Sequence, residues 1–275
     1  MLLALVAERA SGQALEHALR ERFFMPLSLA SLGECPSHPG DTRTTVRGHR
    51  FSNRKFTPHE PENFHLFRGS GGFCGNALDL AHWLRALVTG RALGADSSAL
   101  MTTPVRLNNG VTADYGMALA LASPDGLRRI GHGGYGGGFS DHFAYYPERD
   151  LTVVIMVNRF PYPESIERRI SRRLLELEED KRAPVAVSAA ERAKFTGSYD
   201  LGVHGWYPQI VEAQRELYFE VKPFAPQALV YVGQNEFAAE GDPYGYRFYF
   251  GPEKPEREVR MLTMGMMSWY GLRRP

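Results

Sequence analysis

The sequence predicts an α+β protein in which an antiparallel sheet flanked by helices is followed by a small antiparallel β-barrel-like domain. Three observations support this fold class. Apolar residues recur at helical spacing in the first half, most clearly over residues 76–90. Two β-prone runs, residues 139–146 and 151–157, are joined by the turn residues Pro147 to Asp150. From residue 191 onwards, short aromatic and β-branched runs alternate with turn residues.

The helices of the first half have simple local signals. The sequence opens on an apolar run up to Ser11-Gly12, and residues 13–24 carry apolar side chains at intervals of four. Asn76 is the expected N-cap of the next helix, whose apolar stripe predicts core packing. A short helix is expected near residues 98–101. A last helix is expected over residues 164–178, with its arginines on a solvated face.

A glycine-rich stretch in the middle of the chain is the expected site of chemistry. Residues 127–130 form a first predicted strand, and His132 lies at its end among glycines that let a ligand or another backbone come close. Residues 139–146 form a second strand. The third, residues 151–157, is an unbroken apolar run that suits a central strand covered on both faces.

This stretch carries a resemblance to a known family. His132-Gly133-Gly134, the following Gly-Gly-Phe-Ser and a Tyr-Pro-Glu turn resemble the third motif of the serine β-lactamase and penicillin-binding-protein superfamily, in its class C-like branch of esterases and D-amino peptidases. The opening of the C-terminal part, Phe195-x-Gly197-x-Tyr199, resembles the lipocalin-like domain attached to many of these hydrolases. Two further passages are similar to family motifs in the same order: Ser11-Gly12-Gln13 with Phe24-Met25-Pro26-Leu27, and Gly71-Gly72-Phe73 with Asp79-Leu80-Ala81.

The resemblance implies a serine hydrolase that forms an acyl-serine intermediate with an ester, an amide or a D-amino peptide. It implies that His132 faces the nucleophile, where an imidazole that titrates near neutral pH can orient the substrate and stabilise charge. The backbone N–H of Tyr135 is the implied oxyanion donor, and Gly133 and Gly134 would keep that edge open to substrate. Residues 30–70 would wall the cleft.

The other two motifs of the family are not matched. Tyr-x-Asn and Ser-x-Asn are absent from the sequence, and its one Ser-x-x-Lys, Ser52 to Lys55, lies among prolines and polar residues that favour a loop. We therefore expect the nucleophile to lie upstream of Met1 and the chain to be inactive alone. Two alternatives stay open: a non-catalytic binding or regulatory protein, and an enzyme that uses Ser52.

The implied architecture also predicts domain limits and an exposed edge. Residues 1–180 would be the C-terminal portion of the hydrolase domain, residues 181–190 a linker and residues 191–275 the barrel, with side chains filling its interior. Without the family's N-terminal strands, the strand over residues 151–157 would have an unpaired edge. That edge could self-associate or bind an N-terminal complement.

Composition excludes several other classes of protein. A net charge of +1 gives no reason to expect nucleic acid, and no apolar run approaches the roughly 20 residues of a membrane span.

The stretch from Gly131 to Gly136 fits G-x-G-x-x-G but leads into a strand, so no dinucleotide or other cofactor is expected. Cys35 and Cys74 lack metal-ligand spacing and leave one disulfide possible. The sequence has no convincing signal peptide; relatives are commonly exported, but nothing assigns a compartment.

Overall fold

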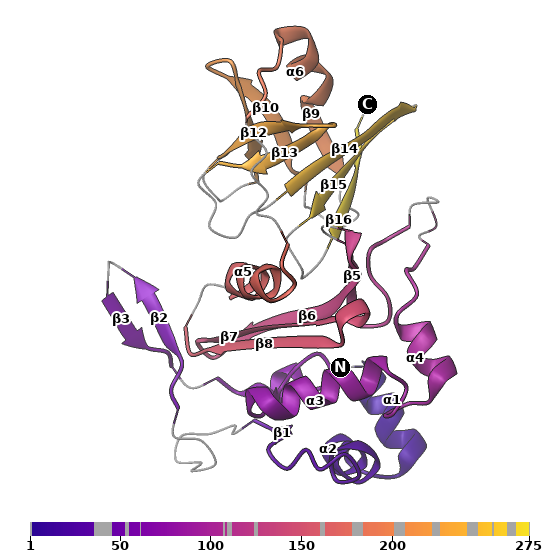
Figure 1. Cartoon of the computed structure of the whole chain (residues 1–275). Coiled ribbons are helices and arrows are strands. Elements are labelled where there is room, and N and C mark those ends of the chain that lie inside the picture. The colour runs from indigo at the N-terminus through magenta and orange to yellow at the C-terminus, as the bar shows by residue number, and fades with distance from the viewer. Residues whose placement is uncertain are drawn as a thin grey trace. The chain divides into compact units, whose positions relative to one another are not determined.

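Figure 1 shows the computed structural model of the chain, which is α+β as expected. It divides into two compact units, Met1–Thr103 with Gly116–Leu175, and Pro104–Tyr115 with Glu176–Pro275. The structure describes residues 2–35, 46–52, 55–60, 62–106, 108, 112–123, 126–159, 163–177, 184–200, 207–221, 226–240, 247–254, 256–262 and 268–274.

The first unit is built on an antiparallel sheet with the strand order β5-β6-β7-β8. Helix α3 covers one face and α5 covers the other (Figure 1). Ile130 and Tyr145 lie opposite each other on the face that packs against Leu84 and Leu87 of α3. The elements are β5 (Ala120–Ala122), β6 (Arg129–Gly136), β7 (Phe139–Tyr146), β8 (Leu151–Val157), α3 (Ala77–Val88) and α5 (Glu164–Leu174).

The remaining elements of this unit surround α3. Asn76 caps α3 as predicted, because its side chain accepts a hydrogen bond from the Asp79 N–H at 2.8 Å. Cys35 and Cys74 form a disulfide that joins the ends of β1 and β4. The bounds are α1 (Leu2–Ser11), α2 (Leu15–Leu19), the π-helix η1 (Arg20–Phe24), β1 (Gly33–Glu34), β2 (His49–Ser52), β3 (Lys55–Pro58), η2 (Phe64–Phe67), β4 (Phe73–Cys74), α4 (Ala95–Met101) and η4 (Pro147–Arg149).

Two expectations about the strands were wrong. The first strand does not end before His132: β6 continues to Gly136, because each of its glycines takes extended backbone and pairs with a residue of β7. Strand β8 has the predicted bounds but is not central, since β7 is its only strand partner in the described part of the chain. The unpaired edge expected for residues 151–157 is therefore present among the described residues.

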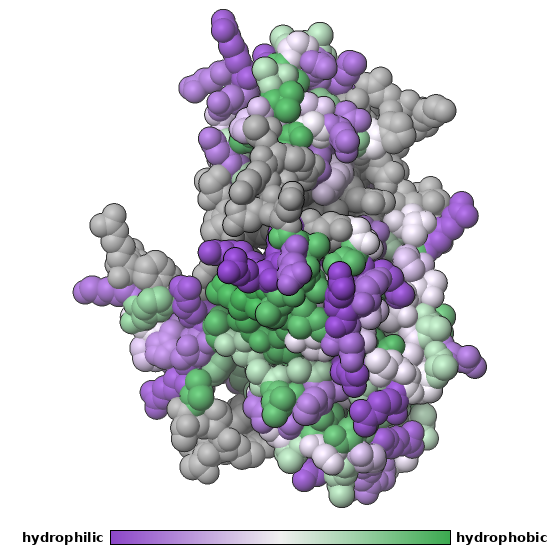
Figure 2. All heavy atoms as spheres, viewed as in Figure 1, coloured by the Kyte–Doolittle hydropathy of each residue, from purple (hydrophilic) through white to green (hydrophobic). Residues whose placement is uncertain are grey.

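Helix α5 buries its polar face and exposes its apolar face, the reverse of a typical amphipathic helix. The arginine-rich pattern predicted that arginines would form the solvated face. Arg169 and Arg173 are indeed exposed, but the helix buries Glu164, Glu167 and Ser171 and leaves its apolar stripe exposed. Figure 2 shows apolar side chains gathered over β8 beside this helix. The exposed apolar residues of α5 are Ile166, Ile170 and Leu174.

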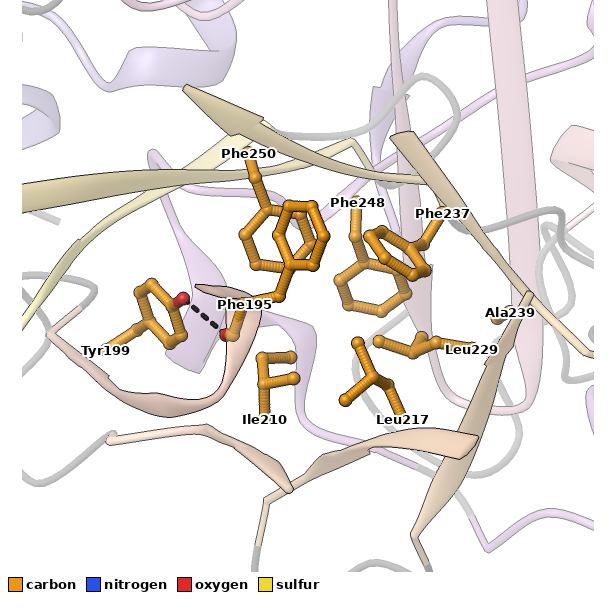
Figure 3. Close-up of a cluster of buried hydrophobic side chains, with 9 residues drawn as sticks. All are labelled: Phe195, Tyr199, Ile210, Leu217, Leu229, Phe237, Ala239, Phe248 and Phe250. Carbon is orange, nitrogen blue, oxygen red and sulfur yellow. Dashed lines mark hydrogen bonds between the residues drawn. The ribbon is translucent and has the colours of Figure 1, made fainter. Parts of the chain in front are cut away.

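The second unit contains an eight-stranded antiparallel barrel that β9 closes between β10 and β16. Aromatic side chains fill its interior as predicted, and Figure 3 shows Tyr199 donating a 2.6 Å hydrogen bond to the carbonyl of Phe195. Sequence reasoning missed β13. The strands are β9 (Gly197–Asp200), β10 (Gln209–Ala213), β11 (Glu216–Glu220), β12 (Gln227–Gly233), β13 (Glu236–Ala239), β14 (Arg247–Lys254), β15 (Glu256–Leu262) and β16 (Ser268–Arg273).

The predicted linker over residues 181–190 lies partly outside the described residues, and the predicted domain limits stay predictions. Within the described range 184–200, helix α6 (Ala189–Phe195) begins with a capping box in which Ser188 and Glu191 bind each other's backbone N–H. Among the helices that the structure describes, none has the length and apolar character needed to cross a membrane.

Candidate active site

His132 is the fourth residue of β6 and is half-buried beside Phe143, with the two ring centres 6.4 Å apart. Its Nδ1 lies 2.7 Å from the carbonyl oxygen of Gly133, and since a carbonyl only accepts, Nδ1 carries the hydrogen. Burial lowers the pKa of the His132 imidazole, although this hydrogen bond opposes the shift. The neutral ring therefore presents the lone pair of Nε2, which makes it an acceptor at neutral pH.

One edge of β6 is open next to His132. Strand β5 pairs with β6 only as far as Gly131, whose partner is Ala120. Over residues 132–136 the described chain provides β7 on one side and no strand on the other. In an antiparallel strand, the backbone N–H and C=O groups of successive residues point alternately to the two sides of the strand. The groups on this edge can therefore form hydrogen bonds with an extended substrate or with an oxyanion. The Tyr135 side chain on this segment is 70% exposed.

The glycines of the motif leave room where side chains would clash. A Cβ atom at Gly131 would lie 2.1 Å from the carbonyl oxygen of Phe143, which no side chain allows. A Cβ atom at Gly134 would lie 3.1 Å from Oδ2 of Asp141. Gly134 therefore gives the Asp141 carboxylate the space above β6, on the face that also carries His132.

Asp141 is a polar residue of this site that sequence reasoning missed. It lies opposite Gly134 and is half-buried, and burial raises the pKa of its carboxyl group to about 6. Alternation over residues 139–146 places Asp141 on the same face as Phe143, but only the register of β6 and β7 shows that Phe143 is the partner of His132.

A second polar cluster lies on the opposite face of the sheet, under α5. The guanidinium group of Arg129 binds the carboxylate of Glu167, which also lies 3.4 Å from Nδ1 of His142 and accepts a 3.1 Å hydrogen bond from the Tyr146 hydroxyl. All of these side chains are buried, and His142 is the register partner of Gly133. The cluster holds α5 against the two strands that carry the motif.

The pKa values of this cluster follow from burial and ion pairing. Burial lowers the pKa of His142 to about 4, so its ring is neutral. Burial disfavours the Glu167 carboxylate, but the charge of Arg129 and the hydrogen bond from His142 outweigh it and lower the pKa to about 2. Burial likewise disfavours the Arg129 cation, and the charges of Glu167 and Glu164 raise its pKa overall. Sequence reasoning missed this cluster.

Part of the segment expected to wall the cleft packs on the turn between β6 and β7. The Glu62 carboxylate accepts a hydrogen bond from the backbone N–H of Gly137. A Cβ atom at Gly48 would lie 1.9 Å from the carbonyl oxygen of Gly137, so the two backbones touch. These contacts fix the far end of the β6–β7 hairpin.

The Ser-x-x-Lys sequence lies away from any helix. Ser52 is the last residue of β2, Lys55 is the first of β3, and the two are directly paired across the hairpin. The family motif places its lysine one helical turn after the serine, which a hairpin cannot do. The structure thus has paired strands at Ser52 and Lys55 where a loop was expected, and the absence of the family's nucleophile motif stays a prediction. In the described chain, no group of His, Cys, Asp and Glu residues could hold a metal ion.

Comparison with known sequences agrees with the motif. Residues 1–178 match the Beta-lactamase family. Penicillin-binding protein 4* of Bacillus subtilis is 25% identical over 243 residues, which are 80% of this chain and 53% of the relative. A D-aminopeptidase of Brucella canis is 26% identical over 166 residues, 57% of this chain and 30% of the relative. The chain thus spans about half the length of the first relative and less than a third of the second.

Solved structures share the fold. The octameric penicillin-binding protein homologue from Pyrococcus abyssi superposes with a TM-score of 0.58 at 16% identity, covering 99% of this chain and 63% of that one. The penicillin-binding protein from Bacillus halodurans gives a TM-score of 0.52 at 20% identity, covering 63% of this chain and 53% of that one. Together with the match over residues 1–178, these similarities lead to one conclusion: the chain belongs to the Beta-lactamase family.

Proposed function

We propose that this chain is the part of a serine hydrolase that carries the His132 wall of the active site. The whole protein would hydrolyse an ester, an amide or a D-amino peptide through an acyl-serine intermediate. The open edge of β6 beside His132 is the observation that carries this proposal. The D-aminopeptidase name of the Brucella relative favours the D-amino peptide within this range.

In the proposed reaction the acyl group of the substrate lies along residues 132–136. A serine oxygen adds to the acyl carbonyl carbon, the bond to the leaving group breaks, and the leaving group takes up a proton. The carbonyl oxygen gains negative charge as this happens and accepts a hydrogen bond from the Tyr135 N–H, a contact of the kind whose loss costs about 3 kcal/mol in the barrier. Gly133 and Gly134 admit the substrate because they carry no side chain.

In this scheme His132 orients the bound substrate and also acts on the attacking group. With Nδ1–H bound to the Gly133 carbonyl, Nε2 can accept a hydrogen bond or a proton from the serine hydroxyl or from the water that later cleaves the acyl-serine ester. The lowered pKa of the His132 imidazole supports this role, because it keeps Nε2 unprotonated at neutral pH.

The nucleophilic serine belongs, in this proposal, to a part of the protein that these 275 residues do not include. The hairpin position of Ser52 supports this, since Lys55 is not one helical turn away. The chain alone would then bind an acyl donor without forming an acyl-enzyme. The proposal also includes self-association, or binding of an N-terminal complement, through the edge of β8, whose partners among the described residues lie on one side only. A stable monomer by light scattering would contradict that last part.

Two measurements on the 275-residue chain test the proposal. Intact-mass spectrometry after incubation with a fluorophosphonate probe, and separately with benzylpenicillin, should give no adduct. Titration with the uncharged amide N-acetyl-D-leucinamide should shift the backbone NMR signals of residues 133–135. His132→Gln should weaken that binding, whereas His82→Gln, a matched change of an exposed histidine on α3, should not.

The outcomes separate this proposal from an enzyme that uses Ser52. A stoichiometric adduct on a serine of this chain would overturn the placement of the nucleophile and make Ser52 the first candidate. Absence of any shift in residues 133–135 would overturn the assignment of the substrate edge.

A further inference from the structure

Asp141 lies on β7, directly across from Gly134 of β6. It pairs with Gly134 of β6 on one side and with Met156 of β8 on the other. His132 is diagonal to it on the same face of the sheet, a relation that corresponds to about 7–8 Å between residues. Its Oδ2 lies 3.1 Å from the position that a Cβ atom of Gly134 would occupy, so the carboxylate leans from β7 across β6 towards the open edge.

The surroundings of Asp141 give its negative charge no compensation. No residue in the described part of the chain forms a hydrogen bond or ion pair with this carboxylate, and desolvation alone raises its pKa. Its neighbours on the face are the His132 imidazole, which burial keeps neutral, and the apolar side chain of Met156. A half-buried carboxylate without a cation is costly, and a cation brought by a ligand would remove that cost.

The sheet's other charged groups do not supply this cation. Arg129 extends from β6 to the opposite face, where Glu167 binds it. Arg85 of α3, the helix that covers the Asp141 face, forms a two-point ion pair with Asp150 at 2.5 and 2.9 Å. Each of these guanidinium groups is therefore held elsewhere.

We propose that Asp141 is the residue that binds a primary ammonium group on the substrate, so that the site prefers acyl donors with a free amine next to the reacting carbonyl. This rests on the proposed function, since it uses the same edge of β6. An ammonium group on the α-carbon of an acyl group bound at Tyr135 would point over Gly134 into the space that the absent side chain leaves. The carboxylate and the ammonium group then form a charge-assisted hydrogen bond.

The test compares two ligands that differ at the α-nitrogen, where acetylation removes the charge and adds an acetyl group. D-Leucinamide carries a free ammonium group and N-acetyl-D-leucinamide does not. At pH 7 the Asp141 carboxyl, whose pKa is about 6, is largely ionised, and an α-amino group is largely protonated. Dissociation constants come from the backbone NMR shifts of residues 133–135 in the 275-residue chain. The variant is Asp141→Asn, which keeps the shape and removes the charge, and the control is Asp96→Asn at an exposed position of α4.

The wild type and Asp96→Asn should bind D-leucinamide about tenfold more tightly than the acetylated amide. Asp141→Asn should remove this preference while binding N-acetyl-D-leucinamide within about twofold of the wild type, which also shows that the variant is folded. Equal binding of both amides by the wild type, or a preference that survives Asp141→Asn, would overturn the role of Asp141 and leave the proposed function standing. Binding of neither amide at residues 133–135 would overturn both.

Discussion

Replacing Glu167 by glutamine should loosen α5 from the sheet, because the change leaves the guanidinium group of Arg129 buried without its nearest carboxylate. Arg129 and Glu167 are both fully buried, and the second carboxylate, that of Glu164, lies 4.0 Å from Arg129. Breaking a buried ion pair by removing one partner typically costs about 3–5 kcal/mol.

The pKa of Glu167 gives a second measure of the same quantity. Its pKa is lowered from 4.5 to about 2 in the folded chain, which corresponds to about 3 kcal/mol of stability. A carboxylate with a lowered pKa contributes this stability above its unfolded pKa and loses it as the pH falls towards the folded value. The full effect is therefore expected at pH 7, and the two routes agree on about 3 kcal/mol.

Native-state hydrogen exchange can assign the loss to the right unit. Peptides from residues 129–157 of Glu167→Gln should show an opening free energy about 3 kcal/mol lower than in the wild type, while peptides from residues 209–239 of the barrel should not change. Glu148→Gln, an exposed change in η4, is the matched control and should cost less than about 0.5 kcal/mol. The double variant Arg129→Met with Glu167→Leu should recover only the part of the loss that comes from the unpaired cation, because it leaves the buried hydroxyl groups of Tyr146 and Ser171 without Glu167 as acceptor.

A loss below about 1 kcal/mol in Glu167→Gln would refute the reasoning, since the buried cation would then not depend on Glu167. An equal loss in the barrel peptides would also refute it. If the double variant were as unstable as Glu167→Gln, the loss would come from packing and lost hydrogen bonds and not from the unpaired charge.

Three further changes have definite expected results. Cys35→Ser opens a disulfide that spans 39 residues of sequence to Cys74 and should cost up to about 4 kcal/mol, measured by thermal unfolding with and without a reductant as control. Phe237→Ala should cost about 3–5 kcal/mol in hydrogen exchange of the barrel only, because its buried ring packs 4.9 Å from the rings of Phe195 and Tyr231. The free energy of unfolding of Asp141→Asn should exceed that of the wild type by an amount that grows between pH 4 and pH 7 to about 3 kcal/mol at most. Burial raises the pKa of the Asp141 carboxyl in the folded chain to about 6, so the wild type loses stability as the pH rises through that value. A difference in stability that does not change with pH would contradict this.

The elements that sequence reasoning placed correctly are those with local causes. Helix α3 follows from its apolar stripe and the Asn76 cap, and β7 and β8 follow from alternation, apolarity and the turn between them. The sequence carries no local signal for the length of β6. Glycine is depleted in strands and common in turns, so only the pairing with β7 decides that the strand continues through Gly133 and Gly134 to Gly136.

The residues of the candidate site also fall into two groups: those that the sequence showed and those that only the fold brings together. The His132, Gly133, Gly134 and Tyr135 motif was visible in the sequence because its residues are adjacent, and their roles stay predictions. Asp141 was missed because its relation to His132 depends on the register of two strands.

By itself the sequence determined the α+β class, the family resemblance, strands β7 and β8 and the aromatic filling of the barrel, because each is written in neighbouring residues or in a short period. Only the tertiary structure decided which face of α5 is buried. Arg129 and Glu167 are 38 residues apart in the sequence, and only the fold brings these two charged groups together. The sequence of the helix therefore did not show that Ile166, Ile170 and Leu174 would be exposed. The open edge of β6 was decided in the same way, since it exists because β5 ends opposite Gly131.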